Sequence, residues 1–229
     1  MFGLFGKKEP SFDIDSAIKM VAIEGNNWID IYGVIENVKK DEIEIKVPLL
    51  PQYMANTLVP ISPEKEVDTN LLEIHKDGSV KLFNFSTKIK DILLSERIIV
   101  ISKPSKFKEK TFGKAKELLN NFDIEVEIDI EYNAVGVPHV QKGKTHRIFH
   151  NGISLFTSIP IPVKTIIEVS LKIPYVEYAE KKKDKFTASV VESKQLEKKK
   201  FETVLNYESI EDSLKNYLLE YSLLNQKVD

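Results

Sequence analysis

Short stretches of alternating apolar and polar residues, separated by turn signals, fill residues 21–102. The alternation is clear over Trp28–Ile35 and again over Ile43–Val47, with polar residues between the two runs. A second pair of runs flanks Asp77-Gly78, where the glycine supplies the positive φ that a tight hairpin needs. Several short strands at regular spacing predict a small antiparallel barrel for this half of the chain.

The first residues suggest less order. Residues 1–20 are interpreted as an N-terminal tail that contains a short helix from Asp13 to Met20. Three large apolar residues and two lysines within positions 2–8 give at most weak contact with a membrane surface. Trp28 is the only tryptophan, and because it lies in an alternating strand, we expect it to pack in the core.

Residues 103–121 are rich in lysine and poor in apolar residues until Leu118 and Leu119. We interpret this segment as a linker between two domains, with a short helix that ends at Asn120-Asn121. Its lysines form either a solvated surface, which is the favoured interpretation, or an anion site at the domain junction.

Alternation returns in the second half. Ile124, Val126, Ile128 and Ile130 alternate with acidic residues, which predicts a strand with one face in the core and one in water. Further runs of this kind continue to about residue 207. We therefore predict a second antiparallel β-barrel over 122–229.

The chain closes with a helical pattern. Apolar residues recur at steps of four and three from Ile210 to Val228, which predicts an amphipathic C-terminal helix, with Ser209 and Asp212 as a capping box. Packing of this helix against the second barrel is the favoured interpretation. A homodimer formed through the helix is the alternative, because the same spacing suits a coiled-coil seam.

Composition narrows the class of protein. Apolar residues make up 42% and charged residues 30%, with a net charge of -2, which argues against disorder and against a nucleic-acid surface. The absence of cysteine excludes disulfides, thiolate metal sites and cysteine nucleophiles. No window approaches the roughly 18 apolar residues of a membrane span, so we expect a cytoplasmic protein. The fold class is mainly β, with two small antiparallel β-barrels, the second followed by a C-terminal α-helix.

Catalytic and metal chemistry find little support. The chain has no GxSxG, no glycine-rich phosphate loop and no HExxH, so we expect no enzyme and no catalytic residues. His139, His146 and His150 lie close in sequence but lack a recognised ligand spacing, so no metal site is expected. A small β-barrel nucleic-acid-binding protein is an alternative of another class, although a basic charge and an aromatic stacking platform are missing.

A family resemblance appears in the second half. Residues 152–165 (GISLFTSIPIPVKT), followed by the strand IIEVSLKIP, resemble the central strands of PilZ domains. The first half is similar to the N-terminal barrel of two-domain flagellar-brake (YcgR-like) proteins, through residues 33–48 and the hairpin around Asp77-Gly78. The resemblance implies a two-domain effector of a second messenger.

PilZ domains typically bind cyclic di-GMP through an RxxxR motif and a (D/N)xSxxG motif, since guanidinium planes stack on guanine and hold phosphate. The closest match to the first is Lys110-Thr111-Phe112-Gly113-Lys114, with lysine at both ends. Anchoring the second motif on Gly152 puts Arg147 at the acidic position and Phe149 at the serine position. With only two arginines in the chain, Arg97 and Arg147, no RxxxR can exist.

These departures shape the functional hypothesis. We expect a non-enzymatic PilZ-type regulatory or adaptor protein in motility, surface behaviour or envelope signalling, with no cofactor and with flagellar or envelope proteins as partners. The alternative is a cyclic di-GMP effector with a rebuilt, lysine-based site. The residues implied for ligand binding are Lys110, Lys114, Arg147, Asn151 and Gly152.

Overall fold

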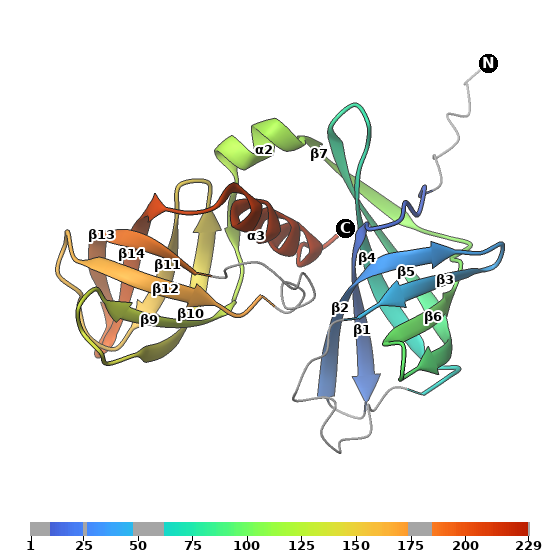
Figure 1. The fold of residues 1–229 in the computed structure, drawn as a ribbon, viewed down its shortest axis with the longest axis horizontal. Helices are drawn as coiled ribbons and strands as arrows, with labels where there is room; N and C mark the ends of the chain where they lie inside the picture. The colour runs from blue at the N-terminus through green and yellow to red at the C-terminus, as the bar shows by residue number, and fades with distance from the viewer. Residues whose placement is uncertain (1–9, 25–26, 48–61, 174–184, 229) are drawn as a thin grey trace. The chain divides into compact units, whose positions relative to one another are not determined.

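The first half of the chain closes into a six-stranded antiparallel ring, called barrel 1 below. The computed structural model describes residues 10–24, 27–47, 62–173 and 185–228. The strands of barrel 1 are β1 (Ala17–Glu24), β2 (Asn27–Val38), β3 (Glu42–Lys46), β4 (Glu66–Ile74), β5 (Ser79–Leu93) and β6 (Ile98–Ser102). They follow one another as β4-β1-β2-β3-β6-β5, and β5 pairs with β4 to close the ring (Figure 1). The predicted barrel is confirmed.

Alternation along each strand builds the core of barrel 1. In β3, Ile43 and Ile45 are fully buried while the polar residues beside them are not. Successive side chains of a strand point to opposite faces, so one face of each strand supplies the core. The predicted turn at Asp77 and Gly78 joins β4 to β5, and Gly78 has a φ of 80°, which glycine adopts without strain.

The helix predicted for residues 13–20 is wrong. A turn occupies Ile14 and Asp15, and β1 then starts at Ala17 and pairs with both β2 and β4. Ile18 and Met20 are fully buried in the barrel. Their spacing of two residues is that of a strand. The pairing of β1 with strands on both sides and the burial of these side chains outweigh the weak local preference for helix.

Trp28 is not in the core. It is 71% exposed and lies opposite Ile23 in the β1–β2 ladder. Its position explains the exposure, because Ile31 and Ile35 of β2 point inward and Trp28 is out of phase with them by one residue. The expectation of a buried tryptophan is therefore wrong.

A seventh strand and a short helix follow barrel 1. β7 (Lys108–Lys114) pairs with β5, and α2 (Ala115–Asn121) begins directly after it, ending at the residues predicted for the helix end. Both elements lie in the range predicted as a linker. The contacts within the chain divide it into two compact units, mainly between Phe112 and Gly113. The domain limits expected from the sequence stay predictions.

The second half closes into another six-stranded antiparallel ring, called barrel 2. Its sheet contains β8 (Asp123–Glu125), β9 (Asp129–Ala134), β10 (Gln141–Phe149), β11 (Gly152–Thr157), β12 (Ile166–Leu171), β13 (Lys185–Glu197) and β14 (Lys200–Ser209). The ring runs β11-β14-β13-β12-β9-β10, and β10 pairs with β11 to close it (Figure 1). β8 is the extra strand, paired with β10. The second predicted barrel is also confirmed.

The strand predicted over 124–130 is in fact two strands, β8 and β9, and the three residues between them belong to neither. Thr145 of β10, which is fully buried, bridges the gap. Its hydroxyl donates to the carbonyl of Val126 at 2.6 Å and accepts the amide of Ile128 at 2.9 Å. The side chain thus satisfies two backbone groups that a regular ladder would have paired.

The predicted C-terminal helix is present as α3 (Asp212–Leu224). Its N-cap residue is Glu211 and no side chain caps it, so the capping box of Ser209 and Asp212 is wrong; Ser209 ends β14 instead. The helix buries Leu214, Leu218, Leu219, Tyr221, Ser222, Leu223 and Leu224. This face is broader than a two-residue coiled-coil seam. In the part of the chain described, no helix is long and apolar enough to cross a membrane.

Candidate functional site

A β-bulge in β10 turns two successive side chains to the outside of barrel 2. The register with β11 shifts between Thr145 and Arg147, so His146 is an extra residue in the ladder. Thr145 and Ile148 are both fully buried, and the residues between them are partly exposed. A bulge re-aims side chains in this way because two residues oppose one on the neighbouring strand. His146 and Arg147 consequently share the outer face.

Arg147 is engaged by Asp123 of β8. The arginine Nε donates to Asp123 Oδ1 at 3.1 Å, and Nη2 donates to Oδ2 at 2.5 Å. This is the forked pairing that a guanidinium makes with a carboxylate. The edge that would bind guanine or phosphate is therefore occupied by a side chain of the same barrel. Both side chains are nearly half exposed, so the pair contributes little to stability.

The neighbouring side chains form an aromatic and polar cluster. The His146 ring stacks on Phe156 of β11 with centroids 4.6 Å apart, and Lys200 Nζ lies 4.6 Å from the same Phe156 centroid. Glu202 of β14 accepts a hydrogen bond from the Ser154 hydroxyl at 3.1 Å, and its Oε1 lies 3.9 Å from His146 Nε2. The cluster offers a planar imidazole face next to a carboxylate.

Sequence reasoning missed most of this cluster. It weighed His146 as a metal ligand, favoured a polar surface role for it, and did not single out Phe156, Ser154 or Glu202. The pattern of alternation could have placed Ser154 and Phe156 on one face of a strand. The pairing of β11 with β14, which brings Glu202 opposite Phe156, depends on a register that one sequence does not contain.

Asn151 and Gly152 lie where β10 turns into β11. The carbonyl of Asn151 accepts the amide of Tyr207 at 2.9 Å. A Cβ on Gly152 would lie 1.9 Å from the carbonyl oxygen of Leu205 and 2.7 Å from Cε2 of Phe149. Glycine is therefore required here by the close approach of β14 and by the Phe149 ring, whatever the residue contributes to a ligand.

Lys110 and Lys114 lie on β7. Lys110 Nζ is 5.3 Å from the ring centroid of Phe112, the aromatic residue between the two lysines. Lys114 is the last residue of β7 and the N-cap residue of α2. The structure thus places Arg147, Asn151 and Gly152 together on the β10–β11 hairpin and the two lysines together on β7. Their joint role in ligand binding stays a prediction.

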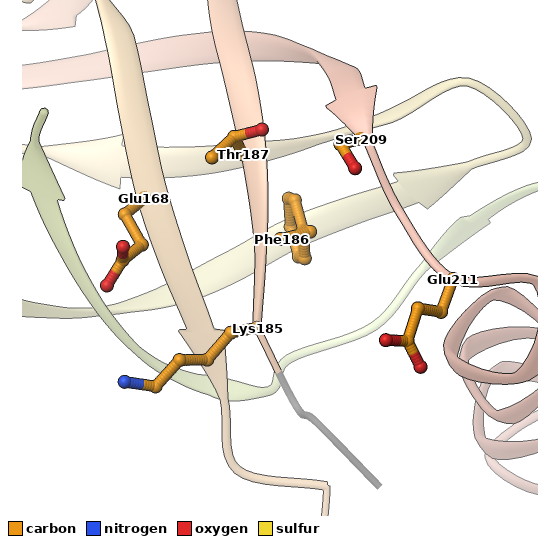
Figure 2. A pocket seen from close by; sticks show the side chains of 6 residues that line it. All are labelled: Glu168, Lys185, Phe186, Thr187, Ser209 and Glu211. Carbon is orange, nitrogen blue, oxygen red and sulfur yellow. The ribbon is translucent and has the colours of Figure 1, made fainter.

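A separate pocket of 240 Å³ opens between β12, β13 and the start of α3 (Figure 2). Its lining consists of Glu168, Lys185, Phe186, Thr187, Ser209 and Glu211. None of the five predicted site residues lines it. Two carboxylates against one amine make it an acidic hollow, which would repel a phosphate diester. Among the described residues, no group of three His, Asp or Glu side chains could hold a metal ion.

Comparison with known proteins gives matches among solved structures alone. No protein-family model and no curated protein matches the chain. Bacillus subtilis MotI/DgrA, an inhibitor of motility, is similar over 92% of this chain and 95% of its own, at 16% identity and a TM-score of 0.38. Borreliella burgdorferi PlzA in complex with c-di-GMP is similar over 92% of this chain and 88% of its own, at 11% identity and a TM-score of 0.31.

Escherichia coli YcgR in complex with c-di-GMP is another match, over 89% of this chain and 80% of its own, at 7% identity and a TM-score of 0.30. Function depends on the residues of a site and not on the fold alone, so the functional assignment must come from the residues of this chain.

Proposed function

We propose that the protein is a non-enzymatic PilZ-type regulatory or adaptor protein that acts mainly through contacts with other proteins. The proposal places it in the cytoplasm, with flagellar or envelope machinery as its partners. Its two barrels are the scaffold, and the outer face of β10 and β11 takes the place of the usual nucleotide site.

The pairing of Arg147 with Asp123 is the observation that carries the proposal. The position where the family has an acid is occupied by an arginine, and that arginine is neutralised within its own barrel. Phe149, at the serine position, supplies a ring instead of a hydroxyl and packs on Gly152. Lys110 and Lys114 keep positive charge but lack the plane and the fork of arginine.

The test is isothermal titration of the full chain with cyclic di-GMP, with GTP and cyclic di-AMP as controls. We expect no saturable binding at micromolar concentrations. The Asp123→Ala variant is titrated beside the natural chain, because it frees the Arg147 guanidinium and removes a negative charge. Any affinity it gains over the natural chain would show that the pairing blocks an anion site.

Selective binding by the natural chain with a Kd of about 1 μM or tighter, equivalent to about -8 kcal/mol, would overturn the proposal. If the Lys110→Ala/Lys114→Ala double variant then lost that binding, the lysine-based effector would be the correct function. The proposed role in motility has a separate test. A strain that lacks the protein should differ from its parent in swimming or surface spreading. Complementation by the double lysine variant should restore the parental behaviour.

A further inference from the structure

Two side chains of residues 10–14, which precede β1, are shielded from solvent. In this segment, called the strap below, Pro10 is buried and Phe12 is half-buried, while Ser11, Asp13 and Ile14 are exposed. The Phe12 ring meets the Phe85 ring edge-on, with centroids 6.1 Å apart, and it packs against the core of barrel 1. Its backbone amide donates a hydrogen bond to Glu73 Oε1 at 2.9 Å.

Glu73 is an unusual acceptor because its carboxylate is buried. The residue is 1% exposed and shares the inner face of β4 with Leu71. A buried carboxylate is costly unless hydrogen bonds compensate it. Among the described residues, the Phe12 amide is the single hydrogen-bond donor to this carboxylate, so the strap supplies what barrel 1 itself does not.

The other oxygen of Glu73 remains without a hydrogen bond. Oε2 is buried and lies 3.7 Å from His75 Nε2, and neither atom has a hydrogen-bond partner among the described residues. Lys81 stands opposite Glu73 in the β4–β5 ladder, but its amine is 2.6 Å from Glu109 of β7. The charged groups around Glu73 thus leave its carboxylate incompletely satisfied, and the strap amide carries a large share of its stabilisation.

The strap has an anchored end and strained residues. The amide of Asp15 donates to the carbonyl of Ile35 at 2.8 Å, and the amide of Ile35 donates to the carbonyl of Ser16 at 3.0 Å, which fixes the chain from Asp15 onward. Asp15 has a φ of 67° and Phe12 a φ of 50°. Left-handed backbone is unfavourable for residues other than glycine, so the docked strap stores strain on both sides of Ile14.

We propose that residues 10–14 form a releasable strap that covers the Glu73 end of barrel 1 and swings away about Asp15 while the barrel stays folded. The burial of Pro10, the contact of Phe12 with Phe85 and the hydrogen bond from the Phe12 amide to Glu73 hold it against the strain of two left-handed residues. Release exposes Glu73 and Phe85 and frees the Phe12 side chain. The strap therefore acts as a conformational device that controls access to this end of barrel 1.

Amide hydrogen exchange of the full chain, followed by NMR, tests the proposal. A releasable strap lets the Phe12 amide exchange through local opening, so we expect it to exchange at least about a hundredfold faster than the Leu71 amide in β4. Glu73→Gln keeps the shape and an acceptor but removes the charge. It should speed exchange at Phe12 roughly tenfold and leave Leu71 unchanged.

Glu66→Gln is the matched control, since it removes an exposed carboxylate at the opposite end of the same strand. It should leave the Phe12 amide unchanged. Phe12→Leu, which keeps the amide but removes the ring contact with Phe85, is the second variant if Glu73→Gln does not fold, and it should also speed exchange. Equal exchange rates at Phe12 and Leu71 in the natural chain would overturn the proposal, and so would a change below about twofold in both strap variants.

Discussion

Replacement of Thr145 by valine tests how the bulge that presents His146 and Arg147 is held in place. Valine has nearly the shape of threonine, so Thr145→Val creates no cavity. It does remove the hydroxyl that serves the Val126 carbonyl and the Ile128 amide. Each buried backbone group left without a partner costs about 1–3 kcal/mol, so we expect the free energy of unfolding to fall by about 3 kcal/mol.

Equilibrium urea unfolding followed by far-UV circular dichroism measures this loss, and amide exchange at Ile128 reports it locally. Thr187→Val is the matched control in the same barrel, because Thr187 is half-buried and its hydroxyl makes no hydrogen bond within the described part of the chain. The control should change stability by less than about 0.5 kcal/mol. A loss below about 1 kcal/mol in Thr145→Val, or an equal loss in the control, would refute the argument that the hydroxyl bridges the gap between β8 and β9.

Three further predictions concern single side chains. Gly152→Ala should destabilise barrel 2 by about 3 kcal/mol or more in urea unfolding, because the new Cβ would clash with Leu205. Gly143→Ala is the control. The nearest contact of its Cβ would be 3.5 Å, so its stability should stay within about 1 kcal/mol of that of the natural chain. Burial raises the pKa of the Tyr207 hydroxyl, so the neutral form is favoured in the folded state and stability should fall as the pH rises above about 10. Tyr207→Phe should reduce that alkaline loss but not abolish it, because burial also raises the pKa of Tyr132. It should cost less than about 1 kcal/mol at pH 7, since the Tyr207 hydroxyl is buried with no hydrogen-bond partner among the described residues. Acrylamide should quench Trp28 fluorescence as strongly in the native protein as in urea, and a shielded native signal would contradict its exposure.

Strand patterns predicted the two barrels well because a period of two survives in most of their strands. β3 and the β4–β5 hairpin could be placed from alternation and from one Asp-Gly turn. β1 could not, since Ile18 and Met20 follow a turn and the short apolar run that contains them fits a helix as well as a strand. Val126 and Ile128 keep the alternation of a strand although they belong to neither β8 nor β9, because the Thr145 hydroxyl pairs the Val126 carbonyl and the Ile128 amide.

The candidate site shows the limit of motif comparison. The resemblance to the PilZ motif predicts Arg147 at an acidic position, but it does not predict that Asp123 neutralises the arginine, because the two residues are 24 positions apart. The cluster around Phe156 depends on the register of β14 and on a bulge of one residue in β10. Such irregularities are set by packing over the whole barrel and leave little trace in local sequence.

Ring closure also bears on aggregation. In the described part of both sheets, the strands that end the hydrogen-bonded order outside the rings are β7 and β8. β7 carries Lys108, Lys110 and Lys114, and β8 is three residues long with Asp123 and Glu125 at its ends. Charged and very short edge strands are poor templates for strands from another molecule. The lateral addition of a strand from another molecule, the route to fibrils and to β-augmented complexes, is therefore disfavoured at these edges. Partners would be recognised through side chains.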